Sequence, residues 1–163
     1  MPTPANAPLS MAERLDPTVH AALARSLGSL SHASALMAAS DWALHLAASP
    51  GQRMDLAHLA LRQGQEMAAY ALARMAAGPD KEARHAVAPP TQDRRFADPA
   101  WQQWPFNLMH QSFVLTEQWW AAATHGVWGV DKHHEDMVAF AARQFLDIFS
   151  PGNQVATNPV VLN

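Results

Sequence analysis

The sequence PFNLMHQSFVLTEQWWAAATH occupies positions 105–125 and has the apolar spacing of an α-helix. Pro105 suits the first helical position, because its ring fixes φ near the helical value. The apolar side chains fall on two faces, with Phe106, Met109, Phe113 and Trp120 on one and Leu108, Leu115 and Trp119 on the other. We therefore expect a helix that is apolar nearly all round.

Helix signals lie on both sides of this segment. Asp98 and Pro99 can cap and start a single turn that carries Trp101. Asp131 should begin the next helix, whose first turns hold acidic residues where the helix dipole favours them. Apolar residues of this helix are Met137, Phe140, Ala141, Phe145, Ile148 and Phe149, and the helix should end at Ser150-Pro151-Gly152.

Three further helices are expected upstream. A short one should run from Asp16 to about Leu27, and a second should begin after Ser31 and end at Ser49-Pro50-Gly51. A long third helix should extend from Gln52 to about Ala77. The small residues Ala60, Gly64 and Ala68 recur every four positions in it, which predicts a flat face that a neighbouring backbone could approach closely.

The expected fold is all-α, a small irregular helical bundle of about five helices with extended N- and C-terminal segments. The chain shows no internal repeat and no pattern of paired strands. We divide this single domain into an N-terminal arm with a short helix (1–30), a helical pair (31–78), a linker or loop (79–97), an aromatic-rich helical pair (98–150) and a C-terminal tail (151–163).

Composition excludes several classes of function. The 163 residues include 11 Lys and Arg against 14 Asp and Glu, so no basic surplus is present to neutralise nucleic-acid phosphates. Without cysteine, the chain has no disulfide, thiolate metal site or cysteine nucleophile. No apolar run approaches the roughly 20 residues of a membrane span, and the N-terminus lacks the apolar region of a secretory signal. We expect a cytoplasmic protein.

Metal and catalytic motifs are weak. In His133-His134-Glu135-Asp136, adjacent helical side chains diverge by about 100° and do not converge on one ion. A site that bridges helices through His45 and His58, or through His110 and Glu117, stays open as a weaker alternative. No nucleophile elbow or glycine-rich phosphate loop occurs. We expect no metal, no cofactor and no covalent chemistry by this chain alone.

Tryptophan is the unusual feature of the composition, with six residues, five of them in the second half. The adjacent Trp119 and Trp120 point about 100° apart on a helix, so they cannot face the same core. One interpretation is an aromatic-rich core with a partly exposed indole. The other is an apolar contact patch for a partner or a hydrophobic particle, formed by Trp101, Trp104, Phe106, Trp119, Trp120 and Trp128.

A series of short motifs then resembles one known family. The block Asp93-Arg94-Arg95-Phe96-Ala97-Asp98-Pro99-Ala100-Trp101 is similar to the N-terminal region of polyhydroxyalkanoate synthases, the polymerases that make poly(3-hydroxybutyrate), and looks class I-like. Further matches follow in the family's order, namely Pro105-Phe106-Asn107, Gln111-Ser112-Phe113, Trp119-Trp120, Arg143-Gln144-Phe145, Ser150-Pro151-Gly152-Asn153 and Ala156-Thr157-Asn158-Pro159. The family-motif residues are Asp93, Arg94, Arg95, Phe96, Asp98, Pro99, Trp101, Gln111, Asn158 and Pro159.

The resemblance extends upstream through Ser40-Asp41-Trp42, His45-Leu46 and Ser49-Pro50-Gly51, and so covers about residues 31–162. Two positions depart from the family pattern. Trp104 stands where the family usually has Asn, and Gln154 stands where it usually has an aromatic residue.

In this family, catalysis belongs to a downstream α/β-hydrolase core with a cysteine, so the resemblance implies no catalytic residue here. It implies a non-catalytic module for dimerisation or granule association in polyhydroxyalkanoate biosynthesis. The implied partners are a synthase catalytic subunit, granule-associated proteins, the polymer surface or a second copy of the chain, which would place it at the granule. An alternative is a part of an acyltransferase that is active only with a separate core. An independent module, a fragment and a gene remnant all stay open.

Overall fold

The computed structural model describes residues 11, 15–19, 31–77 and 95–162, and every regular element in these ranges is helical. The predicted all-α class is confirmed. The long helices are α2 (His32–Ala47), α3 (Pro50–Ala77), α4 (Phe106–Thr124) and α5 (Lys132–Ile148). The short elements are the 3₁₀ turns η1 (Pro99–Gln102) and η2 (Pro151–Asn153) and the helix α6 (Pro159–Leu162).

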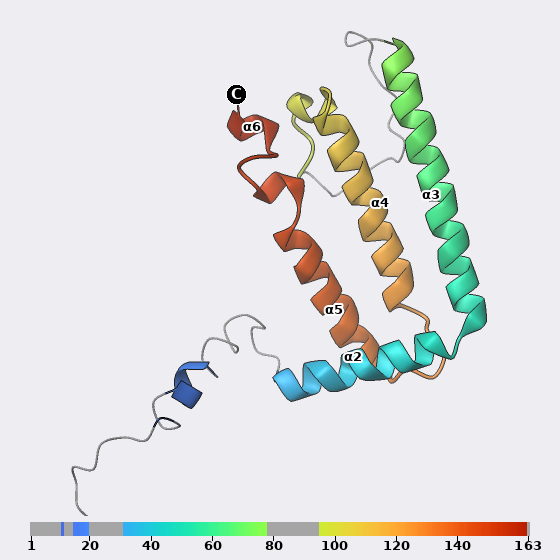
Figure 1. Cartoon of the computed structure of the whole chain (residues 1–163), viewed down its shortest axis with the longest axis vertical. Helices are drawn as coiled ribbons and strands as arrows, with labels where there is room; N and C mark the ends of the chain where they lie inside the picture. The colour runs from blue at the N-terminus through green and yellow to red at the C-terminus, as the bar shows by residue number, and fades with distance from the viewer. Residues whose placement is uncertain (1–10, 12–14, 20–30, 78–94, 163) are drawn as a thin grey trace, which may run out of the picture.

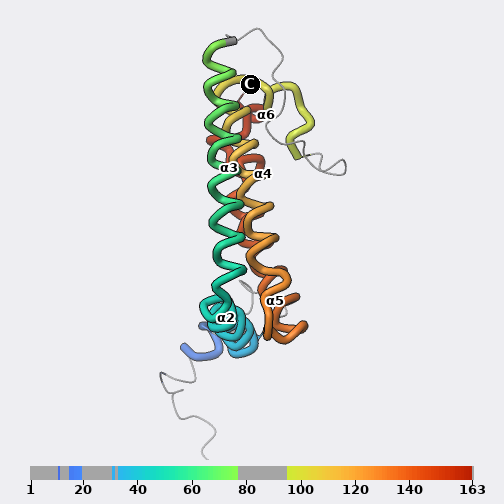
Figure 2. Tube along the Cα trace, turned by 90° about the vertical axis from the view of Figure 1, so that its right-hand side faces the viewer, coloured from blue at the N-terminus to red at the C-terminus, as the bar shows by residue number. Residues whose placement is uncertain are grey.

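Helices α3, α4 and α5 lie side by side in one layer, with α4 in the middle (Figure 1). Viewed from the side, this layer is thin, and α2 crosses it at one end (Figure 2). α4 therefore has helical neighbours on both sides, whereas α3 and α5 lie at the edges. Large apolar side chains of α3, of α5 and of the residue that follows α5 remain exposed, among them Leu61, Met75, Phe145 and Phe149.

Most helix ends follow the sequence signals. Asp131 caps α5 by accepting a hydrogen bond from the backbone N–H of His133 at 2.8 Å. Asp98 caps η1 in the same way through Ala100 N–H, also at 2.8 Å. Pro50 is the first residue of α3, although the sequence predicts it only as part of the break after α2. Proline is compatible with the first turn of a helix. Of the helix predicted from Asp16 to Leu27, residues 15–19 are helical and the rest lies outside the described residues.

The aromatic core lies where η1, the start of α4 and the end of α5 meet. It is formed by Phe96, Trp101, Phe113 and Val114, and the half-buried Phe106 and Leu146 pack against it. Phe96 falls within the predicted linker at 79–97, but it is only 5% exposed, so the packed body starts before residue 98. The C-terminal tail is not extended as predicted, since α6 contacts η1 and Pro159 is buried.

Polar side chains fasten α4 to its neighbours. The amide of Asn107 donates a hydrogen bond to the Tyr70 hydroxyl of α3 at 3.2 Å, and both residues are buried. Two indole N–H groups donate hydrogen bonds to backbone carbonyls of neighbouring helices. Trp119 donates to the Leu56 carbonyl at 3.1 Å, and Trp42 donates to the Ala123 carbonyl at 2.8 Å. Because buried polar groups are costly when unpaired, these bonds fix which helices can be adjacent.

The flat face predicted on α3 is not used for close packing. Ala60 and Gly64 instead border a groove of about 340 Å³ beside α4, and a Cβ added at Gly64 would meet nothing within 4 Å. The close approach occurs elsewhere, at Gly129 in the loop before α5. A Cβ there would lie 2.5 Å from the His45 ring, and Gly129 has a φ of +91°.

Two Gly→Ala substitutions should therefore have opposite effects on stability. Gly129→Ala combines an unfavourable φ with a clash against His45, and we expect the free energy of unfolding to fall by about 1–3 kcal/mol. Gly64→Ala lies within a helix and in open space, so we expect a gain of about 0.5–1 kcal/mol. Urea denaturation of both variants measures the difference, and equal effects would contradict the close approach at Gly129.

Asp41 connects α2 to the start of α5. Its Oδ2 lies 2.7 Å from Nδ1 of His134 and accepts a bond from the Asp131 backbone N–H at 3.2 Å, while Oδ1 lies 3.0 Å from Nδ1 of His45. The hydrogen bond with His134 is the main cause that lowers the pKa of Asp41 below its ordinary value of 3.8. Partial burial opposes this shift, and the Asp131 amide adds to it.

Since the folded state lowers the pKa of Asp41, its stabilising effect is fully present above the unfolded value and is lost as the pH falls through the lowered one. We expect Asp41→Asn to lower the Tm at pH 5–7, where the native carboxylate is charged. The difference in Tm between the two chains should shrink below about pH 4. A difference that is constant from pH 7 to pH 3 would show that the charge of Asp41 does not contribute.

Candidate functional site

Arg95, one of the family-motif residues, joins three parts of the structure, namely the segment before η1, α4 and α5. Its Nη2 lies 2.9 Å from the Glu117 carboxylate on α4, and its Nη1 lies 3.2 Å from Oδ1 of Asp147 on α5. The guanidinium carbon is also 5.5 Å from the ring centres of both Phe96 and Phe113. Arg95 therefore holds the segment before η1 against α4 and α5 through charge and cation–π contact.

The other described motif residues also have structural roles. Phe96 and Trp101 pack edge to face with ring centres 4.8 Å apart, and Asp98 and Pro99 start η1. Gln111 is fully buried, and its Nε2 lies 2.7 Å from Nε2 of His110. Asn158 donates to the Gly152 carbonyl at 2.8 Å and accepts from the Val160 N–H, next to the buried Pro159. Asp93 and Arg94 lie outside the described residues.

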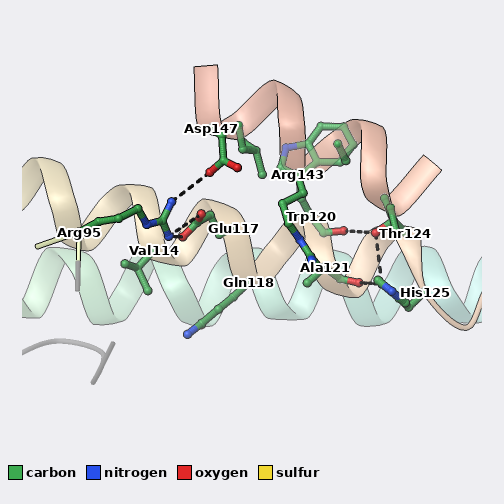
Figure 3. A pocket seen from close by; sticks show the side chains of 13 residues that line it. Arg95, Val114, Glu117, Gln118, Trp120, Ala121, Thr124, His125, Arg143 and Asp147 are labelled. Carbon is green, nitrogen blue, oxygen red and sulfur yellow. Dashed lines mark hydrogen bonds and ion pairs between the residues drawn. The ribbon is translucent and has the colours of Figure 1, made fainter. Parts of the chain in front are cut away.

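A groove of about 720 Å³ runs between α4 and α5 (Figure 3). Its apolar surface includes Val114 and Trp120 of α4 and Ala142 and Leu146 of α5. Arg95, Glu117 and Asp147 also line the groove, together with Arg143 and His125. A second, almost wholly apolar hollow of about 370 Å³ lies among α2, α4 and α5 and shares Trp120, Ala142 and Leu146 with the groove.

The predicted patch of six aromatic residues is not one surface. Trp101 is 1% exposed and belongs to the core, against which Phe106 packs edge to face. Trp119 and Trp120 are both half-buried, and Trp120 packs against Trp42 of α2. Only Trp104 and Trp128 are largely exposed, and they lie beyond opposite ends of α4. Binding by any of the six stays a prediction.

An exposed aromatic cluster that the sequence did not single out lies near the end of α5. Phe145, Ile148 and Phe149 are each about 60% exposed, and the two phenyl rings are 4.8 Å apart. Their i, i+3, i+4 spacing places them on one helix face. That spacing was visible in the sequence, but an amphipathic helix usually buries such a face, so it gave no sign of exposure.

Substituting one buried and one exposed tryptophan distinguishes the contribution of the core to stability from that of the surface. Trp101→Ala removes a fully buried side chain, and we expect the free energy of unfolding to fall by about 3–5 kcal/mol. Trp128→Ala removes one that is 89% exposed, and the change should stay within about 0.5 kcal/mol. Chemical denaturation measures both, and similar losses would contradict this placement of the two residues.

The His133–Asp136 tetrad forms ion pairs in the first turns of α5. Lys132 lies 2.7 Å from Glu135 and 2.9 Å from Asp136, and its hydrogen bonds with these carboxylates raise its pKa. The bond from Lys132, followed by one from the Gly126 N–H, lowers the pKa of Glu135. Among the described residues, no three His, Asp or Glu side chains are grouped to hold a metal ion.

The predicted bridging pair of His110 and Glu117 does not share a site. His110 is buried and stacks on Phe96 with ring centres 5.4 Å apart, whereas Glu117 pairs with Arg95. His45 contacts the Asp41 carboxylate instead, and His58 lines a shallow hollow on α3. The described geometry thus defines a small helical module with apolar hollows and exposed aromatic groups.

Comparison with protein families connects this module to one class of polymerases. Residues 92–163 match the family described as poly-beta-hydroxybutyrate polymerase (PhaC) N-terminus, and residues 10–52 match the family described as poly-beta-hydroxybutyrate polymerase N terminal. Across these two segments the chain is similar to the N-terminal regions of such polymerases. The resemblance inferred from the motif at 93–101 is confirmed.

Two curated relatives agree with this result. The chain is 39% identical over 77 residues to a poly(3-hydroxyalkanoate) polymerase of Methylorubrum extorquens, and 33% identical over 69 residues to a poly(3-hydroxyalkanoate) polymerase subunit PhaC of Rhizobium etli. These matches cover 47% and 42% of the chain but only 13% and 11% of the relatives. No solved structure matches the chain. None of the described helices has the length and apolarity needed to span a membrane.

Proposed function

We propose that this chain is a non-catalytic binding module in polyhydroxyalkanoate biosynthesis, which attaches to the polymer surface through exposed aromatic side chains. The observation that carries this proposal is the cluster of Phe145, Ile148 and Phe149, which α5 presents at the edge of the helical layer. Clustered apolar groups exposed on a soluble domain are typical of contact surfaces. The family match supplies the context of polymer synthesis.

The energetic scale fits adsorption to a hydrophobic particle. Covering one large apolar side chain contributes about 1.5–3 kcal/mol before ordering costs. Since these side chains are already held on a helix, little conformational entropy is lost when a surface covers them. The cluster contains no charge, so covering it leaves no buried ion without a partner. Attachment would place the protein at the granule surface in the cytoplasm.

Protein partners could use the same cluster. A polymerase catalytic subunit, a granule-associated protein or a second copy of the chain would each bury aromatic groups that are exposed in the isolated chain. We place the polymer first because three side chains on one helix form a small patch, whereas a specific protein interface buries about 800 Å² on each partner. Analytical ultracentrifugation of the chain, alone and with polymerase, distinguishes these partners from the polymer.

A second candidate function is a part of an acyltransferase that works only together with a separate hydrolase core. The curated relatives support it, because both are polymerases that this chain matches over a small part of their length. On this view the exposed cluster would contact the core. Polymerase turnover that rises on addition of the chain, without attachment to polymer, would favour this second candidate.

Two double variants test the polymer-binding role. Phe145→Ser with Phe149→Ser should reduce co-sedimentation with poly(3-hydroxybutyrate) particles by tenfold or more, about 1.4 kcal/mol at least, since each lost ring removes apolar contact. The matched control is Leu61→Ser with Met75→Ser on α3, whose side chains are 64% and 77% exposed. Both variants should keep the native Tm within a few degrees. Unchanged sedimentation of the Phe variant, or an equal loss in the control, would contradict the proposal.

A further inference from the structure

The groove between α4 and α5 contains one cation whose charge the described structure does not neutralise. At one end of the groove, Arg95 forms ion pairs with the carboxylates of Glu117, at 2.9 Å, and Asp147, at 3.2 Å. Arg143 also lines the groove, one helical turn before Asp147 (Figure 3). Within the described part of the chain, Arg143 forms no hydrogen bond or ion pair with another residue.

The surface beside Arg143 is apolar and concave. Val114, Trp120 and Leu146 line it, and the small Ala121, Ala139 and Ala142 leave room between the helices. Its volume of about 720 Å³ falls in the range of small-molecule sites. A ligand that matches this groove needs an apolar body and a single anionic group that can accept bonds from a guanidinium.

We propose that this groove binds an aliphatic carboxylate, with the carboxylate on Arg143 and the alkyl chain against Trp120 and Leu146. Arginine is suited to the head group, because its planar donors can bond both carboxylate oxygens. A highly charged ligand such as a nucleoside triphosphate does not fit, since Arg95, the other arginine among the described lining residues, already pairs with two carboxylates. The alkyl chain of the ligand needs only apolar contact, which the surfaces of α4 and α5 supply.

This site is separate from the surface proposed for polymer binding. Phe149 and Ile148 do not line the groove, and Phe145 borders only the neighbouring hollow. The small-molecule site can therefore be correct when polymer binding is not, and the reverse also holds. Their variants do not overlap, so each proposal fails separately.

Calorimetric titration of the full chain with hexanoate, octanoate and decanoate below their micelle concentrations tests the inference. Each added methylene should tighten binding about fourfold until the groove is filled. Octanoate should bind about tenfold more tightly than 1-octanol, which has a similar chain but no charge. The indole N–H of Trp120 should shift in NMR spectra on binding, whereas that of Trp104, which does not line the groove, should not.

Three variants locate the head group. Arg143→Gln should weaken octanoate binding about tenfold, to the level of the alcohol, and Arg143→Lys should restore only part of the affinity, since it restores the charge but not the planar pair of donors. Arg62→Gln, the same change at an exposed arginine on α3, should bind like the native chain. Retained Tm values show that all three remain folded. Equal binding of octanoate and octanol, or an Arg143→Gln chain that binds octanoate normally, would overturn the proposal.

Discussion

The position of α4 between α3 and α5 is the constraint on which the rest of the structure depends. Hydrogen bonds from Asn107 to Tyr70 and from Trp119 to Leu56 fasten α4 to α3, and Arg95 joins its other side to α5. A middle helix in a single layer is covered on two sides, but an edge helix is covered on one. This is why α4 is buried along much of its length while α5 keeps Phe145 and Phe149 exposed.

Local signals in the sequence predicted the helices well, because capping and proline placement act within a few residues. Asp98 and Asp131 cap helix starts as predicted, whereas Pro50, predicted as part of a helix end, is the first residue of α3. Burial was predicted less well, since it depends on which neighbour covers a helix face. On α5, Met137 is buried and Phe140 is exposed, although both belong to the apolar set of the same helix. Periodicity identifies an apolar face without showing what covers it.

The same limit applies to the candidate site. The motif that revealed the family lies largely in the core, where Phe96 and Trp101 pack together and Gln111 is fully buried. These residues specify the fold, so recognising them locates the module but not its binding surface. Six tryptophans suggested one patch, yet Trp101 is internal and Trp104 and Trp128 lie beyond opposite ends of α4. The exposed α5 cluster, and the lack of an ion pair at Arg143 within the described residues, emerge only from tertiary structure.

Hydrogen–deuterium exchange of the full chain, with and without poly(3-hydroxybutyrate) particles, tests most directly whether the core motif builds the module and the edge helix binds. We expect slower exchange in peptides covering residues 140–149 when particles are present, and unchanged exchange in residues 96–101, where Phe96 and Trp101 are buried in the core with or without particles. Slower exchange confined to residues 96–101, or none anywhere in the chain, would contradict the account.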